Sequence, residues 1–313
     1  MMRNFDFIAK AMSAYVESDG TGFRRAARTL QSLWRERSNL PMGEHKGVLL
    51  GSRLPVDLAE RDLANYLTPG IRSVVRDVLK SASEHQNASE IQLFAKPRIY
   101  NDLLSSQPLC FNLFGELKLD FKLATTVLGI LRPDAIKKVT GISFEYSPER
   151  SSERFTGDRS AFDVFVEYDA LNGGRGFLGV EVKYHESLQE SAATNRPRYD
   201  VVAAKMGCFN DASLPKLHDA PLQQFWRDHL LAGSMISDGD LGYAEGAFIV
   251  VYPAANTYCR SAVRKYRESL SDSSTFDAWT LEEFVGILSL ATQEPWVDEF
   301  RGRYLDFRRL LMS

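Results

Sequence analysis

The stretch from Ala161 to Glu186, AFDVFVEYDALNGGRGFLGVEVKYHE, decides the expected fold of this chain. Two runs rich in β-branched and aromatic residues, 161–168 and 177–184, flank a segment that contains Asn-Gly-Gly. Such runs on either side of a glycine-containing turn are typical of a β-hairpin. We therefore expect two antiparallel strands joined by this segment.

Within the hairpin, GRGFLG at 174–179 fits the spacing G-x-G-x-x-G of phosphate-binding loops. That loop binds phosphate where a strand leads into a helix, because the N–H groups of the first helical turn then point at the anion. Here the glycines precede a strand, and no helix start follows them. We interpret them as turn and strand glycines, and the motif then implies no nucleotide cofactor.

Three ionisable residues of the hairpin are candidates for a catalytic site. Glu181 and Lys183 lie two positions apart on one strand, so their side chains project from the same face. Asp163 shares that face if residues paired across the hairpin have numbers of even sum. A loop with an odd number of residues, closed by Asp169 opposite Arg175, meets this condition.

The chemistry of this set indicates hydrolysis of phosphodiesters. Asp163 and Glu181 would supply the oxygen ligands that Mg²⁺ prefers, with Mn²⁺ as a substitute. A bound ion of this kind lowers the pKa of a water molecule and stabilises charge on a phosphate. Lys183 can orient that water and donate to the phosphate, or accept a proton if its pKa falls. The alternative for all three is a solvated strand edge.

The surrounding segments suggest an α/β (α+β) fold. A helical stretch at 105–134 precedes a short strand at 141–148, and a helical stretch at 220–233 follows the hairpin. The apolar run GAFIVVYP at 246–253 is typical of a buried strand. The order helix, strand, strand, strand, helix, strand is buried economically as a mixed central sheet flanked by helices.

Asp163 followed by Glu181-x-Lys183 resembles the D…(D/E)-x-K motif of the PD-(D/E)xK nuclease superfamily. The resemblance implies a restriction-endonuclease-like core with the aspartate on the second core strand and E-x-K on the third. It also implies a glutamate on the first core helix that assists metal binding, and Glu116 in LFGELKLDF matches that position. SSQPLCFNLF and QQFWRDHLLAG are similar to blocks in other restriction-endonuclease-like proteins. One departure is Phe162, which stands where the motif has proline.

Further residues are candidates for substrate binding. Gln224 and Arg227, three apart on a predicted helix, would contact phosphate or position the lysine, and Arg159 and Ser160 precede the second strand. Arginines alternate with aromatic residues in three clusters, as in proteins that follow a phosphate backbone. Charged helix faces with arginine stems on apolar surface give the same pattern. The clusters are FRRAARTLQSLWRER at 23–37, RSAVRKYR at 260–267 and RGRYLDFRR at 301–309.

Composition narrows the class of protein. Hydrophobic residues make up 44% and charged residues 25%, as in globular proteins, and the net charge of −3 leaves room for a basic cleft. The three cysteines form no C-x-x-C pair, which argues against thiolate zinc and for a reducing, cytoplasmic location. No signal peptide or membrane-spanning run is recognised, so no membrane association is expected.

We expect a helical N-terminal region at 1–95 packed on the core, a catalytic core at 96–255 and a C-terminal helical extension at 256–313. The expected activity is that of a Mg²⁺-dependent endonuclease with DNA as its substrate. Two alternatives stay open: RNA as the substrate, and a nucleic-acid-binding or assembly protein that keeps the fold without cleaving. A homodimer would suit cleavage of both strands of a duplex.

Overall fold

The protein is described from a computed structural model, which defines residues 3–84, 94–190 and 192–311. The chain folds into two compact units, each described by itself. The first comprises Met1–Glu116 and Leu288–Ser313, and the second comprises Leu117–Ile287. The predicted division of the chain at residues 95 and 255 stays a prediction.

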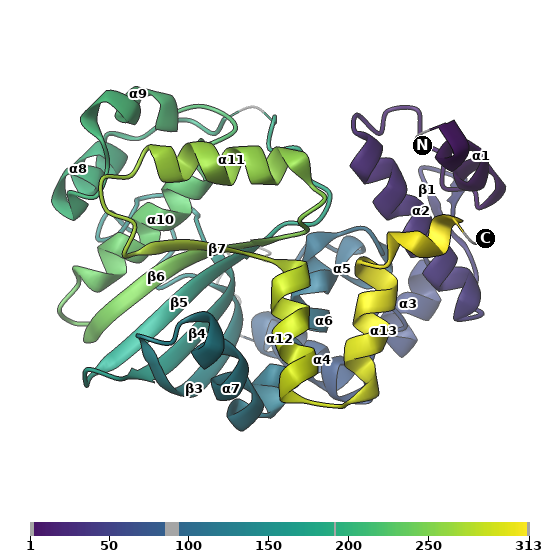
Figure 1. The fold of residues 1–313 in the computed structure, drawn as a ribbon, viewed down its shortest axis with the longest axis horizontal. Helices are drawn as coiled ribbons and strands as arrows, with labels where there is room; N and C mark the ends of the chain where they lie inside the picture. The colour runs from purple at the N-terminus through teal and green to yellow at the C-terminus, as the bar shows by residue number, and fades with distance from the viewer. Residues whose placement is uncertain (1–2, 85–93, 191, 312–313) are drawn as a thin grey trace. The chain divides into compact units, whose positions relative to one another are not determined.

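The second unit is built on a five-stranded sheet with the strand order β3-β4-β5-β6-β7 (Figure 1). Neighbours from β3 to β5 are antiparallel, whereas β5, β6 and β7 are parallel, so the sheet is mixed as predicted. The strands are β3 Ile136–Tyr146, β4 Phe162–Ala170, β5 Arg175–Val182, β6 Tyr243–Tyr252 and β7 Phe276–Thr280. β7 was not predicted.

The β4–β5 hairpin has the register that the sequence requires for a shared acidic face. Asp169 pairs with Arg175, and the same register continues to the pair of Val164 with Val180. One further pair along β4 and β5 places Asp163 opposite Glu181. The odd-numbered loop is therefore confirmed.

The glycines of GRGFLG serve the turn and the packing of the sheet. Gly174 has a φ of +84°, a left-handed conformation that a tight turn requires and that other residues rarely adopt. A Cβ atom on Gly179 would lie 2.4 Å from the ring of Phe162. The ring of Phe162 thus covers Gly179 on the neighbouring strand. This confirms our interpretation of these residues as turn and strand glycines.

Helices cover both faces of the sheet. One face packs on α8, α10 and α11 through a buried cluster that includes Phe165, Phe177, Phe225 and Tyr266. Helix α7 packs on β3, where the hydroxyl group of Thr125 accepts a hydrogen bond from the N–H group of Val139 at 2.9 Å. The helices of this unit are α7 Phe121–Leu131, α8 Pro197–Met206, η1 Asp211–Ser213, α9 Leu214–Leu217, α10 Gln223–Ile236 and α11 Thr257–Glu268.

The single helix predicted at 105–134 is in fact two helices, α6 Ser106–Leu119 and α7. Asp120 separates them, because its backbone leaves the helical conformation (φ −128°, ψ 89°). Its side chain accepts hydrogen bonds from the N–H groups of Lys122 and Leu123, each at 2.9 Å, as an N-cap does. The apolar face continues across the break, which is why spacing alone did not reveal it.

The first unit is mainly helical, with one small hairpin that the sequence did not suggest. Arg303 is buried there and donates to the side chain of Gln31 at 2.9 Å and to the carbonyl of Asn65 at 2.6 Å. The elements are α1 Arg3–Ala11, α2 Gly22–Arg37, β1 Gly43–His45, β2 Val48–Leu50, α3 Val56–Asp62, α4 Pro69–Glu84, α5 Arg98–Asn101, α13 Pro295–Tyr304 and η2 Phe307–Leu311. Helices α6 and α12 (Leu281–Ala291) run across the division between the units.

None of the helices in the described ranges combines the length and the apolar character of a membrane-crossing segment.

Candidate active site

The start of β4 carries Asp163, and the neighbouring end of β5 carries Glu181 and leads to Lys183. The Lys183 Nζ atom lies 2.6 Å from Glu181 Oε1, and both residues are buried, at 7% and 5% exposure. Asp163 is partly buried, and its Oδ2 atom accepts a hydrogen bond from the N–H group of Val182 at 2.7 Å. The structure thus places the predicted aspartate, glutamate and lysine at the same edge of the β4–β5 hairpin. Their roles stay predictions.

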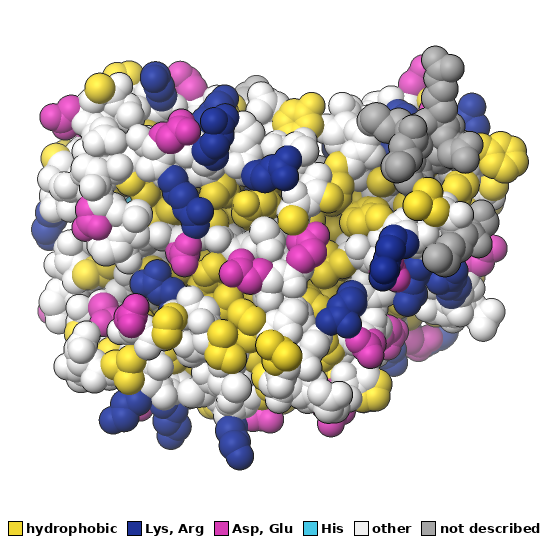
Figure 2. Space-filling view, viewed as in Figure 1, with side chains coloured by type: hydrophobic (Ala, Val, Ile, Leu, Met, Phe, Trp, Pro, Cys, Tyr) yellow, Lys and Arg dark blue, Asp and Glu magenta, His cyan; other side chains and the backbone are white. Residues whose placement is uncertain are grey.

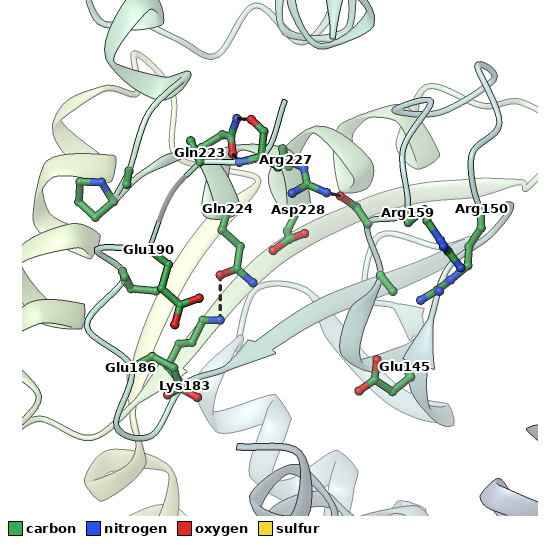
Figure 3. Close-up of a pocket in the computed structure, with 17 residues that line it drawn as sticks. Glu145, Arg150, Arg159, Lys183, Glu186, Glu190, Gln223, Gln224, Arg227 and Asp228 are labelled. Carbon is green, nitrogen blue, oxygen red and sulfur yellow. Dashed lines mark hydrogen bonds between the residues drawn. The ribbon is translucent and has the colours of Figure 1, made fainter. Parts of the chain in front are cut away.

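Gln224, at the start of α10, forms hydrogen bonds with both Glu181 and Lys183, and Figure 3 shows the bond to Lys183. Its Nε2 atom donates to Glu181 Oε1 at 2.7 Å, and its Oε1 atom accepts from Lys183 Nζ at 2.9 Å. The residue itself is exposed to the pocket. This geometry favours the second of the two roles considered for Gln224, positioning of the lysine.

The electrostatics of the site determine which groups carry protons. Burial and the neighbouring charges of Glu181 and Glu145 raise the pKa of Asp163 well above its usual value. Burial alone would lower the pKa of Lys183, but Glu181 and Glu186 outweigh it and raise that pKa above its usual value. The lysine is therefore protonated, so in this state it donates hydrogen bonds and does not act as a base.

Lys183 lines a cavity of about 390 Å³ in the second unit (Figure 3). Lys183, Gln224 and Asp228 lie at its centre. Glu186 and Glu190 border one side, whereas Arg150 and Arg159 border the other together with Glu145 (Figure 3). Arg227 and Ser160 also line the cavity.

Arg227 and Ser160 are organised by Asp158, which the sequence analysis did not single out. Asp158 Oδ2 accepts from Arg227 Nε at 2.7 Å and from the Ser160 hydroxyl at 3.0 Å. The Tyr199 hydroxyl donates to the same oxygen at 2.7 Å. Burial would raise the pKa of Asp158, but Arg227 and these hydrogen bonds hold it below its usual value. The alternation Thr156-x-Asp158-x-Ser160 is the signal that would have revealed this cluster.

Asp228 is a second residue that the sequence analysis missed. It is 4% exposed and follows Gln224 by one turn of α10. Burial and the charge of Glu181 raise its pKa well above the usual value, although Arg227 opposes this effect. The spacing of four residues from Gln224 could have placed it on the same helix face.

Glu116 lies on α6 in the first unit, and its carboxylate accepts a hydrogen bond from the hydroxyl of Thr68. Asn112 and Asp120, four residues before and after Glu116, have structural partners. Asn112 accepts from the N–H group of Leu67 at 3.0 Å, and Asp120 caps α7. Because Glu116 and the hairpin belong to different units, its part in metal binding stays a prediction.

The carboxylates at the site are the candidate ligands of a divalent cation. No three His, Cys, Asp or Glu side chains in the described part of the chain are already arranged to enclose a metal ion. Burial and then the charge of Glu181 raise the pKa of both Asp163 and Asp228, whereas the charge of Lys183 lowers both. Excess negative charge among hard oxygen donors suits a divalent cation such as Mg²⁺.

Two of the three basic clusters have structural roles. In cluster 23–37, buried Arg28 pairs with Asp19 at 2.7 Å, and buried Arg35 donates to the carbonyl of Gly51 at 3.0 Å. In cluster 301–309, Arg303 is buried as described above. Within these two clusters Arg28, Arg35 and Arg303 therefore have partners inside the protein, and a role of the clusters along a phosphate backbone stays a prediction.

Cluster 260–267 differs, because it lies on the outside of α11, where basic side chains are visible in the space-filling view (Figure 2). The helix starts next to the active site. The side chain of Asn256 donates to the carbonyls of Tyr184 and Glu186, at 3.1 and 3.0 Å, and caps α11 through its oxygen. Arg260 and Arg264 follow on the exposed face.

The mixed sheet, with an aspartate and an E-x-K pair on adjacent strands, defines an α/β core of the restriction-endonuclease-like class. A family model described as the PD-(D/E)XK nuclease superfamily matches residues 17–306 of the chain. The protein therefore belongs to the PD-(D/E)XK nuclease superfamily, which confirms the resemblance noted in the sequence. No curated protein and no solved structure showed significant similarity to the chain.

Proposed function

We propose that this protein is a metal-dependent endonuclease that hydrolyses phosphodiester bonds in DNA. The observation that carries the proposal is the buried contact between Lys183 and Glu181, at 2.6 Å, next to Asp163 on the facing strand. Lys183 also lines a cavity, and the chain belongs to the nuclease superfamily.

In this proposal Asp163 and Glu181 would hold a Mg²⁺ ion, for which Mn²⁺ can substitute. When bound, such an ion lowers the pKa of water and stabilises charge on the phosphate. Lys183 is protonated, so it orients the attacking water and donates to a phosphate oxygen. Gln224 fixes the ammonium group through its hydrogen bond at 2.9 Å.

Two basic regions support a nucleic-acid substrate. Asp158 fixes Arg227 at the side of the cavity, where Ser160 and Arg159 also lie, and this group suits contact with a phosphate. The exposed arginines of α11 suit contact with the phosphate backbone of the nucleic acid outside the cavity. We infer DNA as the substrate from the restriction-endonuclease-like core, with RNA as the second candidate. Cleavage of both strands of a duplex would fit a homodimer.

The decisive experiment compares linear, supercoiled and single-stranded DNA with RNA, each with Mg²⁺ or with EDTA. We expect cleavage of DNA that EDTA abolishes and that Lys183→Ala reduces by about a thousandfold or more, a loss typical of removing a group that acts in the transition state. The exposed lysine of α8 supplies the matched control, Lys205→Ala, which should cleave as the wild type does.

Each alternative gives a different result. Metal-dependent cleavage of RNA alone would reassign the substrate and keep the site. Binding of nucleic acid without cleavage would identify a non-cleaving protein with a nuclease fold. Cleavage that survives Lys183→Ala would refute the proposed site.

A further inference from the structure

Asp228 is a buried acid that lines the cavity, and one of its oxygens lacks a partner. It is 4% exposed, and its Oδ2 atom forms no hydrogen bond with the described residues. In Figure 3 its carboxylate points into the space beside Gln224. A buried carboxylate oxygen without a partner is costly, so we expect a group that enters the cavity to complete it.

The cavity also carries cationic groups that suit a phosphate. Arg150 and Arg159 border one side together with Glu145, and Arg227 lines the cavity as well (Figure 3). Guanidinium groups bind phosphate through charge-assisted hydrogen bonds. A phosphate is, however, much smaller than a cavity of about 390 Å³. The ligand that fills this space therefore has a further part.

Apolar lining indicates what that further part is. Leu188, Ala193 and Pro221 line the cavity, and Leu188 packs on the buried cluster of the second unit. Gln223, itself 3% exposed, holds this lining against α10. It accepts a hydrogen bond from the N–H group of Ala193 at 2.6 Å and donates to the carbonyl of the same residue at 2.5 Å. A nucleobase has apolar faces for such a lining and a polar edge for an unpaired carboxyl group.

One nucleotide combines the groups that these features require. Its phosphate suits the arginines, and its base suits the apolar lining and Asp228. The cavity volume of about 390 Å³ lies in the range of ligand pockets, about 300–1,000 Å³. Lys183 lines the same cavity, so a nucleotide bound there would lie beside the lysine proposed to act in cleavage.

We propose that the cavity binds a single nucleotide of the substrate strand, unstacked from its neighbours, and that Asp228 forms a hydrogen bond with the edge of its base. The inference rests on the proposed nuclease function and names the part of the nucleic acid that the cavity recognises. Asp228 is then a residue that contacts substrate, whereas Gln224 on the same helix positions the lysine.

The protonation of Asp228 supports this role. Burial and the charge of Glu181 raise the pKa of Asp228 well above its usual value. A neutral carboxyl group can both donate and accept a hydrogen bond, as a side-chain amide does. Asp228→Asn should therefore keep the contact with the base, whereas Asp228→Leu should lose it.

The test measures ligand binding to the full chain by titration calorimetry, without metal. The probes are the four deoxynucleoside 5′-monophosphates and 2-deoxyribose 5-phosphate, which lacks a base. At least one nucleotide should bind about tenfold tighter than deoxyribose phosphate. Asp228→Leu should weaken that nucleotide by about tenfold or more and leave deoxyribose phosphate within about twofold, as loss of one buried hydrogen bond does.

Three further variants complete the comparison. Asp228→Asn should bind the nucleotide within about threefold of the wild type. Arg159→Ala, at an exposed arginine of the cavity, should weaken the nucleotide and deoxyribose phosphate alike. Asp211→Leu removes an exposed acid that does not line the cavity and should change neither affinity.

The outcomes separate this inference from the proposed function. Equal affinities of the wild type for nucleotides and deoxyribose phosphate, or no binding of either, would overturn recognition of a base. Equal losses of both ligands in Asp228→Leu would mean that Asp228 contacts the phosphate or only shapes the fold. None of these results touches the cleavage assay, whose failure would refute the nuclease function even if nucleotides bind.

A second readout tests the unstacking in a whole substrate. The fluorescence of 2-aminopurine rises when the base loses its stacking neighbours, so the analogue is placed at successive positions of a DNA duplex bound by the Lys183→Ala protein. We expect a rise at one position, and a smaller rise there when Asp228→Leu is added, because unstacking then loses its compensating contact. A duplex in which no position responds would contradict the proposal.

Discussion

At the scale of single residues, the site is a set of charges that hold one another in place. Glu181 Oε1 accepts both from Lys183 at 2.6 Å and from Gln224 at 2.7 Å, while Gln224 also accepts from Lys183 at 2.9 Å. The triangle leaves the ammonium group little freedom. A neutral amide is suited to this place, because it donates to the carboxylate and accepts from the ammonium at once.

Replacing Gln224 by alanine should therefore lower kcat more than it raises KM. We expect kcat to fall by about tenfold or more, because Lys183 loses the acceptor that orients it and not its charge. Steady-state cleavage of an oligonucleotide would measure both constants. Gln189→Ala, at an exposed glutamine after the hairpin, is the control and should change neither. A rise in KM alone would show that Gln224 contacts the substrate instead.

At the scale of elements, the hairpin was predictable and the helix ends were less so. The parity of residue numbers limited the register of β4 and β5 to pairs of even sum, since an odd sum would divide the acids between two faces. The break at Asp120 was not predicted because the apolar helix face continues through it. Strand β7 was not predicted because it has only five residues. The positions of Asp163, Glu181 and Lys183 followed from strand periodicity. The contacts of Asp158 and Asp228 depend on packing between distant segments, which one sequence does not display.

The close packing of the hairpin leads to a prediction on stability. Gly179→Ala would place a Cβ atom 2.4 Å from the ring of Phe162 and should destabilise the protein by about 1–3 kcal/mol, as overpacking does. Urea unfolding would measure the change. Gly239→Ala adds a methyl group in open space and should change stability by less than about 0.5 kcal/mol.

A second change would identify the cause of that loss. Phe162→Leu in the Gly179→Ala background should recover part of the stability, because the smaller side chain relieves the contact. Additive losses in the double variant would place the cause elsewhere than in this ring.

Helix α11 leads to a prediction on nucleic-acid binding. Arg260→Ala should weaken binding to a DNA duplex by a catalytically inactive Lys183→Ala protein, and it should reduce the slope of log K against log salt by about one. Arg308→Ala is the matched control from cluster 301–309, where the arginine pairs with Asp306 at 3.0 Å. We expect it to leave the slope unchanged. Equal slopes for the Lys183→Ala protein with and without Arg260→Ala would remove α11 from the interface.

At the scale of the whole molecule, buried titratable groups link stability to pH in opposite directions. The carboxyl groups of Asp163 and Asp228 have raised pKa values, so without metal the native state binds more protons than the unfolded chain. Their contribution to stability declines as pH rises above their usual range. Burial lowers the pKa of His229 to about 3. Its effect on stability is therefore opposite, because stability falls as pH falls below the ordinary pKa of histidine.

His229 gives a prediction whose sign can be derived. It is fully buried as a neutral ring between the hydroxyls of Tyr266 and Thr275, at 2.9 and 2.8 Å. Below its ordinary pKa of about 6.5 the unfolded chain takes up a proton that the native ring does not, so stability falls by about 1.4 kcal/mol per pH unit. The loss ends near the native pKa of about 3. His229→Gln lacks this titration and should show a shallower slope of unfolding free energy between about pH 6.5 and pH 5. Because Asp163 and Asp228 are present in both proteins, the difference between the two slopes isolates His229, and equal slopes would mean that the ring is protonated in the native state.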